Sequence, residues 1–174
     1  MARVAAGTID AMLDRLPMRR RKTLSCGIVV VLDSRELLLC HVTGQRNWDL
    51  PKGGIHADET PCEAALRETH EETGLRLSPA ALVDLGRHDY TMGKDLHLFA
   101  CLSERVDPRA LECTSCFVDR RSGRTRPEMD GFGWFAFERI GALCTPPLAR
   151  LLGRTLELDR VVADLVAGRE RLAA

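Results

Sequence analysis

The sequence shows no excess of charge of either sign and no long apolar run. Its 25 Lys and Arg residues balance 25 Asp and Glu residues, so no overall field recruits nucleic acid or a membrane, and any phosphate recognition has to be local. No apolar run approaches the roughly 20 residues that span a bilayer. The N-terminal segment carries Asp10 and Asp14 and lacks the continuous apolar core of a signal peptide. We therefore expect a cytoplasmic protein with no membrane partner.

Cysteine occurs in an odd number, seven, which argues against a framework of disulfides. Three of the cysteines lie inside apolar, strand-like runs and suit reduced, buried thiols: Cys26, Cys40 and Cys101. Cys113 and Cys116 form a C-x-x-C pair, but a zinc site needs a second pair, and Cys144 is the only later cysteine. We therefore do not expect a metal at this pair.

A length of 174 residues, 45% of them hydrophobic and 29% charged, suits one globular domain, and no repeat is present. Residues 1–22 read as an arm: Ala2–Leu16 has the apolar spacing of a short amphipathic helix, and Arg19–Lys22 is a basic run. This run suits a solvated linker, with a phosphate or RNA contact as the alternative. The single domain is expected over 23–174, including a C-terminal helix.

Within this domain the pattern of apolar residues alternates between strands and helices. Strands are predicted at 24–32 and 36–42, forming a hairpin, at 82–90 and 96–102, and at 132–137. Short helical structure is predicted at 138–143, followed by a helix over 146–167 with a possible break at Gly153. This order predicts an α/β fold with a mixed sheet that helices cover on both faces.

The stretch from Leu50 to Leu75 organises the rest of the chain. Thr60 can cap a helix, and Glu63, three residues later, completes a capping box. Gly74 can adopt the left-handed conformation that closes a helix. A helix of about thirteen residues is therefore predicted between the cap and this glycine.

Glu68, Glu71 and Glu72 fall on one face of this helix, at i, i+3 and i+4. Carboxylates so close repel one another, and the last two also oppose the helix dipole, so helix stability alone does not explain them. A solvated acidic face is one interpretation. The preceding loop, Pro51–Gly54, favours another, because its glycines allow close approach of the backbone and its carbonyls can join the oxygen shell of Mg²⁺ or Mn²⁺.

At this point the chain resembles the Nudix family, whose signature is G-x5-E-x7-R-E-U-x-E-E-x-G-U, with U apolar. The matching residues are Gly53, Glu59, Arg67, Glu68, Glu71, Glu72, Gly74 and Leu75. Thr69 departs from the pattern, since a bulky aliphatic residue is usual there. The resemblance implies an α/β/α sandwich and an Mg²⁺- or Mn²⁺-dependent hydrolase that cleaves the diphosphate bond of a nucleoside diphosphate derivative.

Roles for the signature residues follow from this resemblance. Glu68 and Glu72 are assigned as the principal metal ligands, with Glu71 and the Lys52 carbonyl as additional ones. Arg67 is expected to orient the carboxylates through charge-assisted hydrogen bonds, although an ordinary surface ion pair is the alternative. In the same pattern, Glu59 fixes the loop to the helix.

Glu128 lies six positions before Trp134, and this interval is similar to one in the branch of the family that hydrolyses diadenosine tetraphosphate. That branch also resembles the chain in the CGIVVV strand, in the W-x-L-P-K-G approach and in the RETHEETG core, which carries Thr at the position of Thr69. By this analogy Glu128 is a mobile ligand or base, although a loop Glu is often only solvated. Glu68 and Glu128 both remain candidates for the base that activates the attacking water.

Residues 106–131 are predicted to be the least regular stretch, and a loop of this length is typical of a functional or mobile segment. Its cations can grip phosphates or can simply be solvated: Arg120, Arg121, Arg124 and Arg126. Elsewhere, Arg46, Lys52 and Lys94 are candidate contacts to a polyphosphate chain. The sequence has only five Phe, two Trp and one Tyr, and three of these are candidates to stack on a base although each also suits the core: Trp48, Tyr90 and Phe117.

The favoured substrate is a dinucleoside polyphosphate, because of the PKGG loop and Glu128. Triphosphorylated or capped RNA ends are an alternative, as are diphosphoinositol polyphosphates. A sensor that binds nucleotides without hydrolysis is a third possibility, but loss of a motif carboxylate is its usual mark and none is lost here. Either a monomer or a homodimer fits the sequence.

Overall fold

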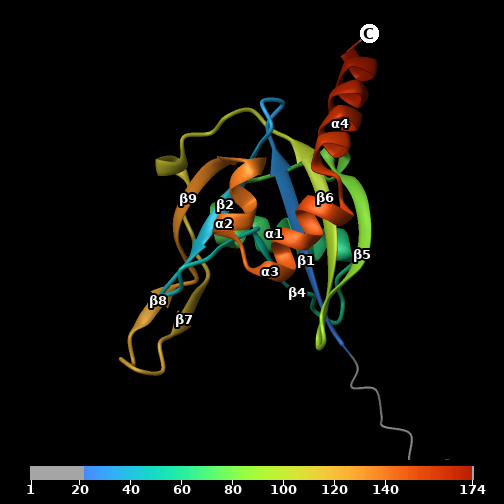
Figure 1. Ribbon diagram of the computed structural model, residues 1–174. Coiled ribbons are helices and arrows are strands. Elements are labelled where there is room, and N and C mark those ends of the chain that lie inside the picture. The colour runs from blue at the N-terminus through green and yellow to red at the C-terminus, as the bar shows by residue number, and fades with distance from the viewer. Residues whose placement is uncertain (1–21, 174) are drawn as a thin grey trace, which may run out of the picture.

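The structure is a computed structural model that describes residues 22–173 (Figure 1). The predicted helix over residues 2–16 and most of the basic run lie outside these residues, so the division into arm and domain stays a prediction. Lys22, the last residue of the run, forms ion pairs with Asp89 and with Asp95 (2.9 Å). Among the described residues, no helix combines the length and the hydropathy needed to cross a membrane.

A seven-stranded mixed sheet forms the centre of the domain. Its strands are β1 (Thr23–Val31), β2 (Glu36–Val42), β3 (Trp48–Asp49), β4 (Lys52–Gly54), β5 (Val83–Thr91), β6 (Lys94–Leu102) and β9 (Met129–Ala136). The order is β3-β2-β1-β6-β5, while β4 pairs with β1 and β9 pairs with β2. The β1–β6 pair is parallel and the other pairs are antiparallel, so the predicted mixed sheet is confirmed.

The alternation of side chains along β1 explains why helices cover both faces of the sheet. Val29 and Val31 enter one core cluster, whereas Ile28 and Val30 enter another on the opposite face. All four side chains are fully buried. A strand with an apolar residue at every position needs a layer on each side.

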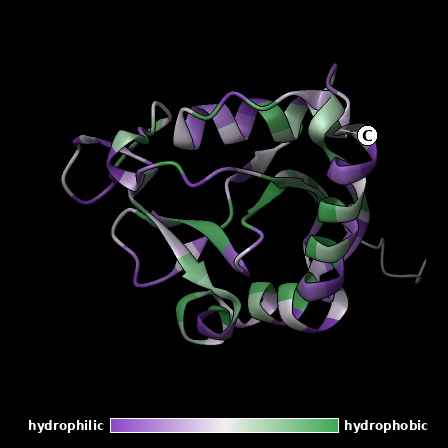
Figure 2. Cartoon of the chain, turned by 90° about the horizontal axis from the view of Figure 1, so that it is seen from above, coloured by the Kyte–Doolittle hydropathy of each residue, from purple (hydrophilic) through white to green (hydrophobic). Residues whose placement is uncertain are grey.

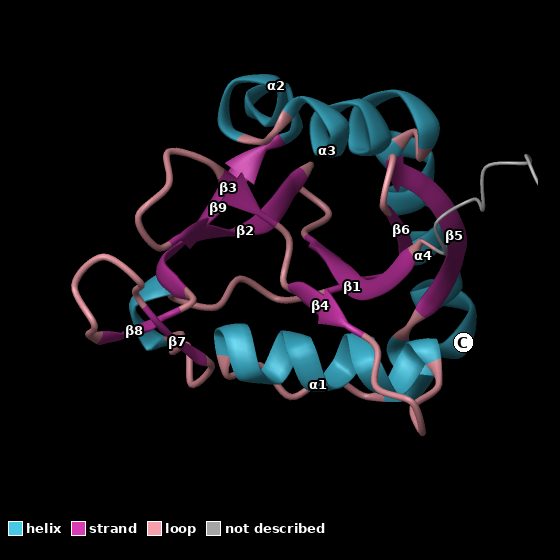
Figure 3. Ribbon diagram, turned by 90° about the horizontal axis from the view of Figure 1, so that it is seen from below, coloured by secondary structure: helices cyan, strands magenta, loops and turns pink. Residues whose placement is uncertain are grey.

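One helix covers the first face and several helical segments cover the second, which confirms the expected α/β/α arrangement (Figure 3). The first layer is α1 (Pro61–Thr73). The second layer contains α2 (Ile140–Leu143), α3 (Pro146–Arg150), a π-helical turn (Leu151–Thr155) and α4 (Leu158–Ala173). The predicted break at Gly153 is confirmed, because the π-helical turn and a positive φ of 47° at Glu157 separate α3 from α4. Figure 2 shows hydrophobic residues in the strands between the layers, while α1 alternates between polar and hydrophobic residues.

The structure corrects two sequence expectations. In the described chain, β1 and β2 pair at one position, Val31 with Leu37, and then diverge, so the predicted hairpin is open. β4 fills the space along the first half of β1, which places the Lys52–Gly54 loop in the middle of the sheet.

The stretch over 106–131 is also more regular than predicted. It contains β7 (Cys116–Val118) and β8 (Thr125–Pro127), which form a projecting hairpin (Figure 1), and β9 starts within it.

Candidate active site

Helix α1 has both of the predicted caps. The Thr60 hydroxyl accepts a hydrogen bond from the Glu63 backbone N–H (3.3 Å), and the Glu63 carboxylate accepts one from the Thr60 N–H (2.8 Å). Gly74 has a φ of 76°, and its N–H donates to the His70 carbonyl (2.8 Å). These caps fix where the helix starts and ends, and therefore which residues face the sheet.

The helix buries two of its three acidic residues. Glu68 and Glu72 are 8% and 2% exposed, whereas the Glu71 side chain is 40% exposed. Burial raises the pKa of the Glu68 carboxyl. Burial also raises the pKa of Glu72 to about 8, and the charges of Glu68 and Glu128 add to this increase. Two carboxylates are therefore held where their ionised forms are disfavoured.

Gly53 lets α1 approach β4 closely. A Cβ atom at this position would lie 2.1 Å from Glu68 Oε2, whereas a Cβ atom at Gly54 would have no neighbour within 4 Å. No real Cβ contact is as short as 2.1 Å, so a side chain at position 53 would displace the Glu68 carboxylate. The presence of glycine at position 53 of the signature thus has a steric explanation, because β4 and the Glu68 carboxylate are in close contact there.

Arg67 connects the helix to the preceding loop. It donates to both oxygens of Glu59 (2.5 and 2.9 Å), to Glu68 Oε1 (2.7 Å), to Glu71 Oε2 (3.1 Å) and to the Gly54 carbonyl (2.9 Å). Hydrogen bonds from Arg67, and then one from the His56 N–H, lower the pKa of Glu59 to about 2. These are the contacts that an arginine orienting the carboxylates would make, and a bidentate fork suits that task.

Lys52 contributes to the site through its backbone as well as its side chain. Its N–H donates to Glu72 Oε2 (2.8 Å), so β4 directly holds the most buried carboxylate. Its ammonium pairs with Asp49 Oδ2 (2.7 Å), and the Lys52 side chain is 14% exposed. The lysine predicted to contact polyphosphate therefore already has a partner. Sequence reasoning did not single out Asp49, although its i, i+3 spacing from Lys52 was a usable signal.

Residues 52–54 and 61–73 form a region that we call the carboxylate corner. Glu128 lies beside this corner, although it is distant in the sequence. Its backbone is held on two sides, since its carbonyl accepts from Thr43 N–H (2.9 Å) and its N–H donates to the Ser115 carbonyl (3.0 Å). The neighbouring Thr114 N–H donates to the Glu71 carbonyl on α1 (2.7 Å). The Glu128 charge contributes to the raised pKa values of both Glu68 and Glu72, which places it within electrostatic range of both. Sequence reasoning missed the contribution of Ser115, whose hydroxyl lies 3.5 Å from Glu128 Oε2.

The remaining predicted substrate contacts are spread around the domain. Arg46 is exposed in the turn between β2 and β3, and Lys94 is exposed at the start of β6. Tyr90 is partly buried against the core, with its hydroxyl 3.5 Å from Thr145 Oγ1. Trp48 packs edge-on against Phe135, which is a core role. Within residues 22–173, no hydrogen bond or ion pair joins any of these four side chains to Glu68 or Glu72.

Cys113 and Cys116 are free thiols, the first in the segment that leads to β7 and the second at the start of that strand. Cys113 Sγ accepts a hydrogen bond from the Met129 N–H (3.4 Å) and lies 3.3 Å from Ser115 Oγ. The Cys113 side chain therefore helps to hold the segment next to Glu128.

The acidic residues of the corner suit a hard divalent cation. Within residues 22–173, no three His, Cys, Asp or Glu side chains form a ready-made metal cage. Glu68 and Glu72 are nonetheless buried close to Glu71 and Glu128, and the hydrogen bonds that offset this charge come from Arg67 and from the Lys52 backbone. Oxygen donors with excess negative charge are the ligands that Mg²⁺ and Mn²⁺ prefer.

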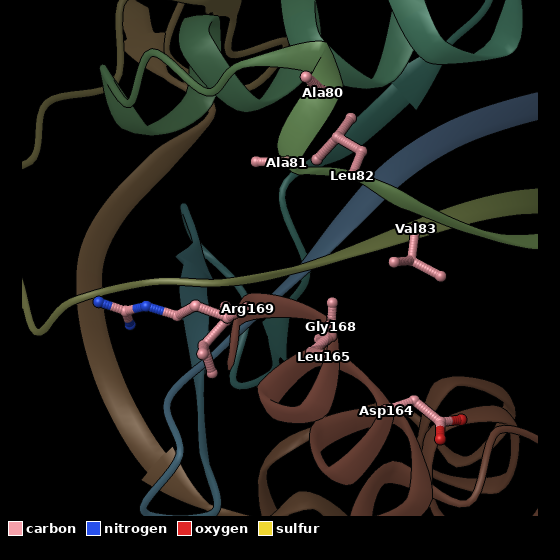
Figure 4. Close-up of a pocket in the computed structure, with 9 residues that line it drawn as sticks. Ala80, Ala81, Leu82, Val83, Asp164, Leu165, Gly168 and Arg169 are labelled. Carbon is pink, nitrogen blue, oxygen red and sulfur yellow. The ribbon is translucent and has the colours of Figure 1, made fainter. Parts of the chain in front are cut away.

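Two hollows differ in how close they lie to these carboxylates. One of about 280 Å³ is enclosed by Ala80–Val83 on one side and by Asp164, Leu165, Gly168 and Arg169 of α4 on the other (Figure 4). It is largely apolar, and its two charged residues have opposite signs. A hollow of about 310 Å³ does border the corner, between the turn after β2 and the β7–β8 hairpin, and Glu128 lines it.

Comparison with known protein families and sequences gives a consistent result. The family model described as NUDIX domain matches residues 21–152. An uncharacterised 17.7 kDa protein of Enterobacteria phage T4 is 35% identical over 144 residues, which cover 76% of this chain and 95% of the phage protein. A protein of Vibrio atlanticus (strain LGP32) named RNA pyrophosphohydrolase is 30% identical over 122 residues, covering 66% of this chain and 70% of that protein.

Solved structures share the fold at low sequence identity. The NUDIX domain of Shewanella oneidensis NrtR complexed with ADP ribose is 16% identical (TM-score 0.58; 87% of this chain and 98% of that one). An Ap4A hydrolase of C. elegans is 18% identical (TM-score 0.51; 83% and 98%). A bifunctional NMN adenylyltransferase/ADP ribose pyrophosphatase of Francisella tularensis, complexed with AMP and Mn ion, is 15% identical (TM-score 0.58; 86% of this chain), and the chain spans 45% of its length. At these identities the likeness establishes the fold alone.

Proposed function

The chain belongs to the Nudix family, and from this premise we propose that it is an Mg²⁺- or Mn²⁺-dependent pyrophosphohydrolase acting on a nucleoside polyphosphate. Hydrolysis of a phosphorus-containing anhydride bond is the activity that this family and its RNA pyrophosphohydrolase members represent. The observation that carries the proposal is the pair of buried carboxylates, Glu68 and Glu72, that α1 presses against Gly53 and the Lys52 N–H. A pair so costly to ionise is explained by a cation that it binds.

The metal ligands in this proposal are Glu68 and Glu72, with Glu71 and the Lys52 carbonyl as additional donors. A divalent cation held there supplies positive charge that neutralises the phosphate oxygens and favours in-line attack by water. A structural neighbour from Francisella tularensis was solved with AMP and Mn ion, which is consistent with this choice of metal.

The chain's own residues have separate tasks. Arg67 holds Glu68 and Glu71 in place and ties them to the loop through Glu59. Glu68 and Glu128 were both candidate bases, and their contacts distinguish them: Glu68 Oε1 receives a short hydrogen bond from Arg67 (2.7 Å), whereas the Glu128 side chain has Ser115 at 3.5 Å. The less engaged carboxylate is better able to accept a proton from water, so we assign Glu128 as the base and Glu68 as a ligand.

A dinucleoside polyphosphate is the substrate we favour, because the PKGG loop and Glu128 resemble those of the diadenosine tetraphosphate branch. The C. elegans Ap4A hydrolase has the same fold. A 5′-polyphosphorylated RNA end is the second candidate. The name of the Vibrio relative supports it, and so do three exposed arginines on the β7–β8 hairpin, Arg120, Arg121 and Arg124.

The test is product analysis on a panel containing diadenosine tetraphosphate, triphosphorylated RNA and ADP-ribose, with Mg²⁺ and with chelator. Wild type, Glu72→Gln and Glu104→Gln are compared, since Glu104 is 91% exposed and serves as a matched control. We expect Glu72→Gln to lose at least about 100-fold in Mg²⁺-dependent turnover, because it removes a ligand charge. Glu104→Gln should match the wild type.

The panel separates the parts of the proposal. Cleavage of RNA ends but not of diadenosine tetraphosphate would overturn the favoured substrate and leave the enzyme class intact. Full turnover by Glu72→Gln would overturn the metal assignment. Binding without any turnover by the wild type would favour the sensor hypothesis.

A further inference from the structure

A hollow of about 310 Å³, here called the hairpin hollow, separates the turn after β2 from the β7–β8 hairpin. It is lined by Val42, Thr43, Gln45, Phe117, Glu128 and Met129. Glu128 lines it, the nearby Thr114 N–H donates to the Glu71 carbonyl of α1 (2.7 Å), and Figure 3 shows the hairpin beside one end of that helix. The hollow is therefore adjacent to the place where a phosphate chain would be cleaved.

The lining has the composition of a site for a flat, partly polar ring. Val42, Met129 and Phe117 provide apolar surface, and the aromatic ring is a platform on which a nucleobase can stack. The Gln45 amide offers both a donor and an acceptor at the edge. The volume of the hollow falls at the lower end of the range for small-molecule sites, which are mostly apolar with a few polar groups.

Thr43 provides an independent sign of a missing ligand. The residue is 6% exposed, and its hydroxyl is buried without a hydrogen-bond partner among the residues that the structure describes. Its backbone N–H does have a partner, the Glu128 carbonyl, so the side chain is held at the hollow. A buried hydroxyl without a partner is unfavourable, and rotation of the Thr43 side chain about χ1 would bring this hydroxyl to the polar edge of a ligand in the hollow.

Backbone contacts within the protein order both walls of the hollow without a ligand. On one side, the Gln45 N–H donates to the Val42 carbonyl (3.0 Å), and Gly44 takes a φ of 77° that closes the turn. On the other side, Phe117 pairs with Arg126 across the β7–β8 hairpin. A preformed site avoids much of the ordering cost of binding.

We propose that the hairpin hollow binds the nucleobase of the substrate, with Phe117 stacking on the ring and Gln45 and Thr43 contacting its polar edge. The proposal rests on the proposed function, since it names the part of the nucleotide that the site recognises. With the base in the hollow, its phosphates extend past Glu128 toward α1. Phe117, Gln45 and Thr43 thereby select nucleotides over other diphosphates.

A direct binding test uses two probes that differ only by the base, AMP and ribose 5-phosphate, titrated calorimetrically into the full-length wild type. We expect AMP to bind at least about tenfold more tightly, because stacking on an aromatic side chain contributes roughly that factor or more per base. Equal affinities would overturn the proposal. This test does not depend on turnover, so a protein that prefers AMP but cleaves nothing would retain the base site while losing the proposed enzymatic function.

Variants on one strand locate the base site. Phe117→Ala should raise the KM for a nucleotide substrate about tenfold with little change in kcat, and Phe117→Tyr should restore the wild-type value because it keeps the ring. Val118→Ala is the matched control, since Val118 is the next residue and is 63% exposed. An unchanged KM in Phe117→Ala, or an equal rise in Val118→Ala, would show that the ring does not hold the base.

A second variant addresses the hydroxyl. Thr43→Val removes an unpartnered polar atom and keeps the branched shape, so the ligand-free protein should melt at a higher temperature. The preference for AMP over ribose 5-phosphate should decrease at the same time. A stabilised protein with an undiminished preference would show that the hydroxyl takes no part in base recognition, and a destabilised one would contradict the idea that it lacks a partner.

Discussion

Two regions meet at the candidate site, and they are built in different ways. The carboxylate corner, formed by residues 52–54 and 61–73, is nearly continuous in sequence, and one capped helix sets the spacing of its charges. The hairpin wall, formed by residues 113–128, reaches the same place through long-range contacts such as that from Thr114 N–H to the Glu71 carbonyl. In the function that we propose, the corner carries the chemistry shared by the family, and the wall provides the surface that distinguishes one substrate from another.

Gly53 gives the sharpest test of how tightly the corner is built. Gly53→Ala places a Cβ atom 2.1 Å from Glu68 Oε2, so the carboxylate has to move. A displacement of about 1 Å in a ligand can cost on the order of 100-fold in kcat, and we expect a loss of that size measured with Mg²⁺ at saturating substrate. KM should change less, because the wall that we propose binds the base is untouched.

Gly54→Ala is the control for this substitution. The neighbouring glycine has open space around its Cβ direction, so the variant should keep near-wild-type kcat. If both variants lose activity equally, a general effect on the loop, and not the contact with Glu68, is responsible. If neither does, the corner is more tolerant than its geometry indicates.

We expect Glu72 to lower the stability of the folded protein when no cation is bound. Its pKa is raised to about 8, mainly by burial, while an unfolded glutamate titrates near 4.5. The folded state therefore binds a proton that the unfolded state releases, so this contribution to stability is present below about pH 4.5 and is lost as the pH rises toward 8. In chelator at pH 8, Glu72→Gln should be more stable than the wild type by roughly 2 kcal/mol, as measured by urea unfolding.

Lowering the pH and adding Mg²⁺ should each change the difference in stability between Glu72→Gln and the wild type. The advantage of Glu72→Gln should shrink toward pH 5, where the wild-type carboxyl is protonated. Mg²⁺ at pH 8 should stabilise the wild type and have a weaker effect on the variant, because a ligand that binds only the folded state raises stability. A variant that is less stable than the wild type in chelator at pH 8 would mean that the Glu72 carboxylate is compensated in the folded protein.

The difference between the two regions also explains how much the sequence could predict. The limits of α1, its caps and its acidic face follow from local rules of spacing, and all three were found. The open β1–β2 pair was not predicted. β4 separates the two strands, and the sequence of neither strand indicates this insertion. The β7–β8 hairpin was missed as well, since each of its strands is only three residues long, which is too short to show the alternating pattern of a strand. The pairing of Lys52 with Asp49 competes with the polyphosphate contact that was predicted for that lysine.

Two buried threonines without hydroxyl partners, Thr69 in the carboxylate corner and Thr43 in the hairpin hollow, give the smallest and most discriminating prediction. Thr69, at the position where the signature calls for an aliphatic residue, is 1% exposed, and its hydroxyl has no partner in the described chain. Thr69→Val should stabilise the protein by about 1 kcal/mol in thermal unfolding and leave kcat and KM unchanged, because no ligand reaches the inner side of α1. Thr73→Val is the opposite control: its hydroxyl donates to the Thr69 carbonyl (2.5 Å), so losing it should destabilise the helix.

Thr69 and Thr43 therefore share a chemistry but differ in what their variants should do. Both Val substitutions relieve a buried unpartnered hydroxyl, so both should raise the melting temperature. Only Thr43→Val should also weaken the preference for AMP over ribose 5-phosphate, because only Thr43 lines the hairpin hollow. If both variants stabilise the protein and neither affects the preference, the two hydroxyls are equivalent packing defects, and base recognition has to come from Phe117 and Gln45 alone.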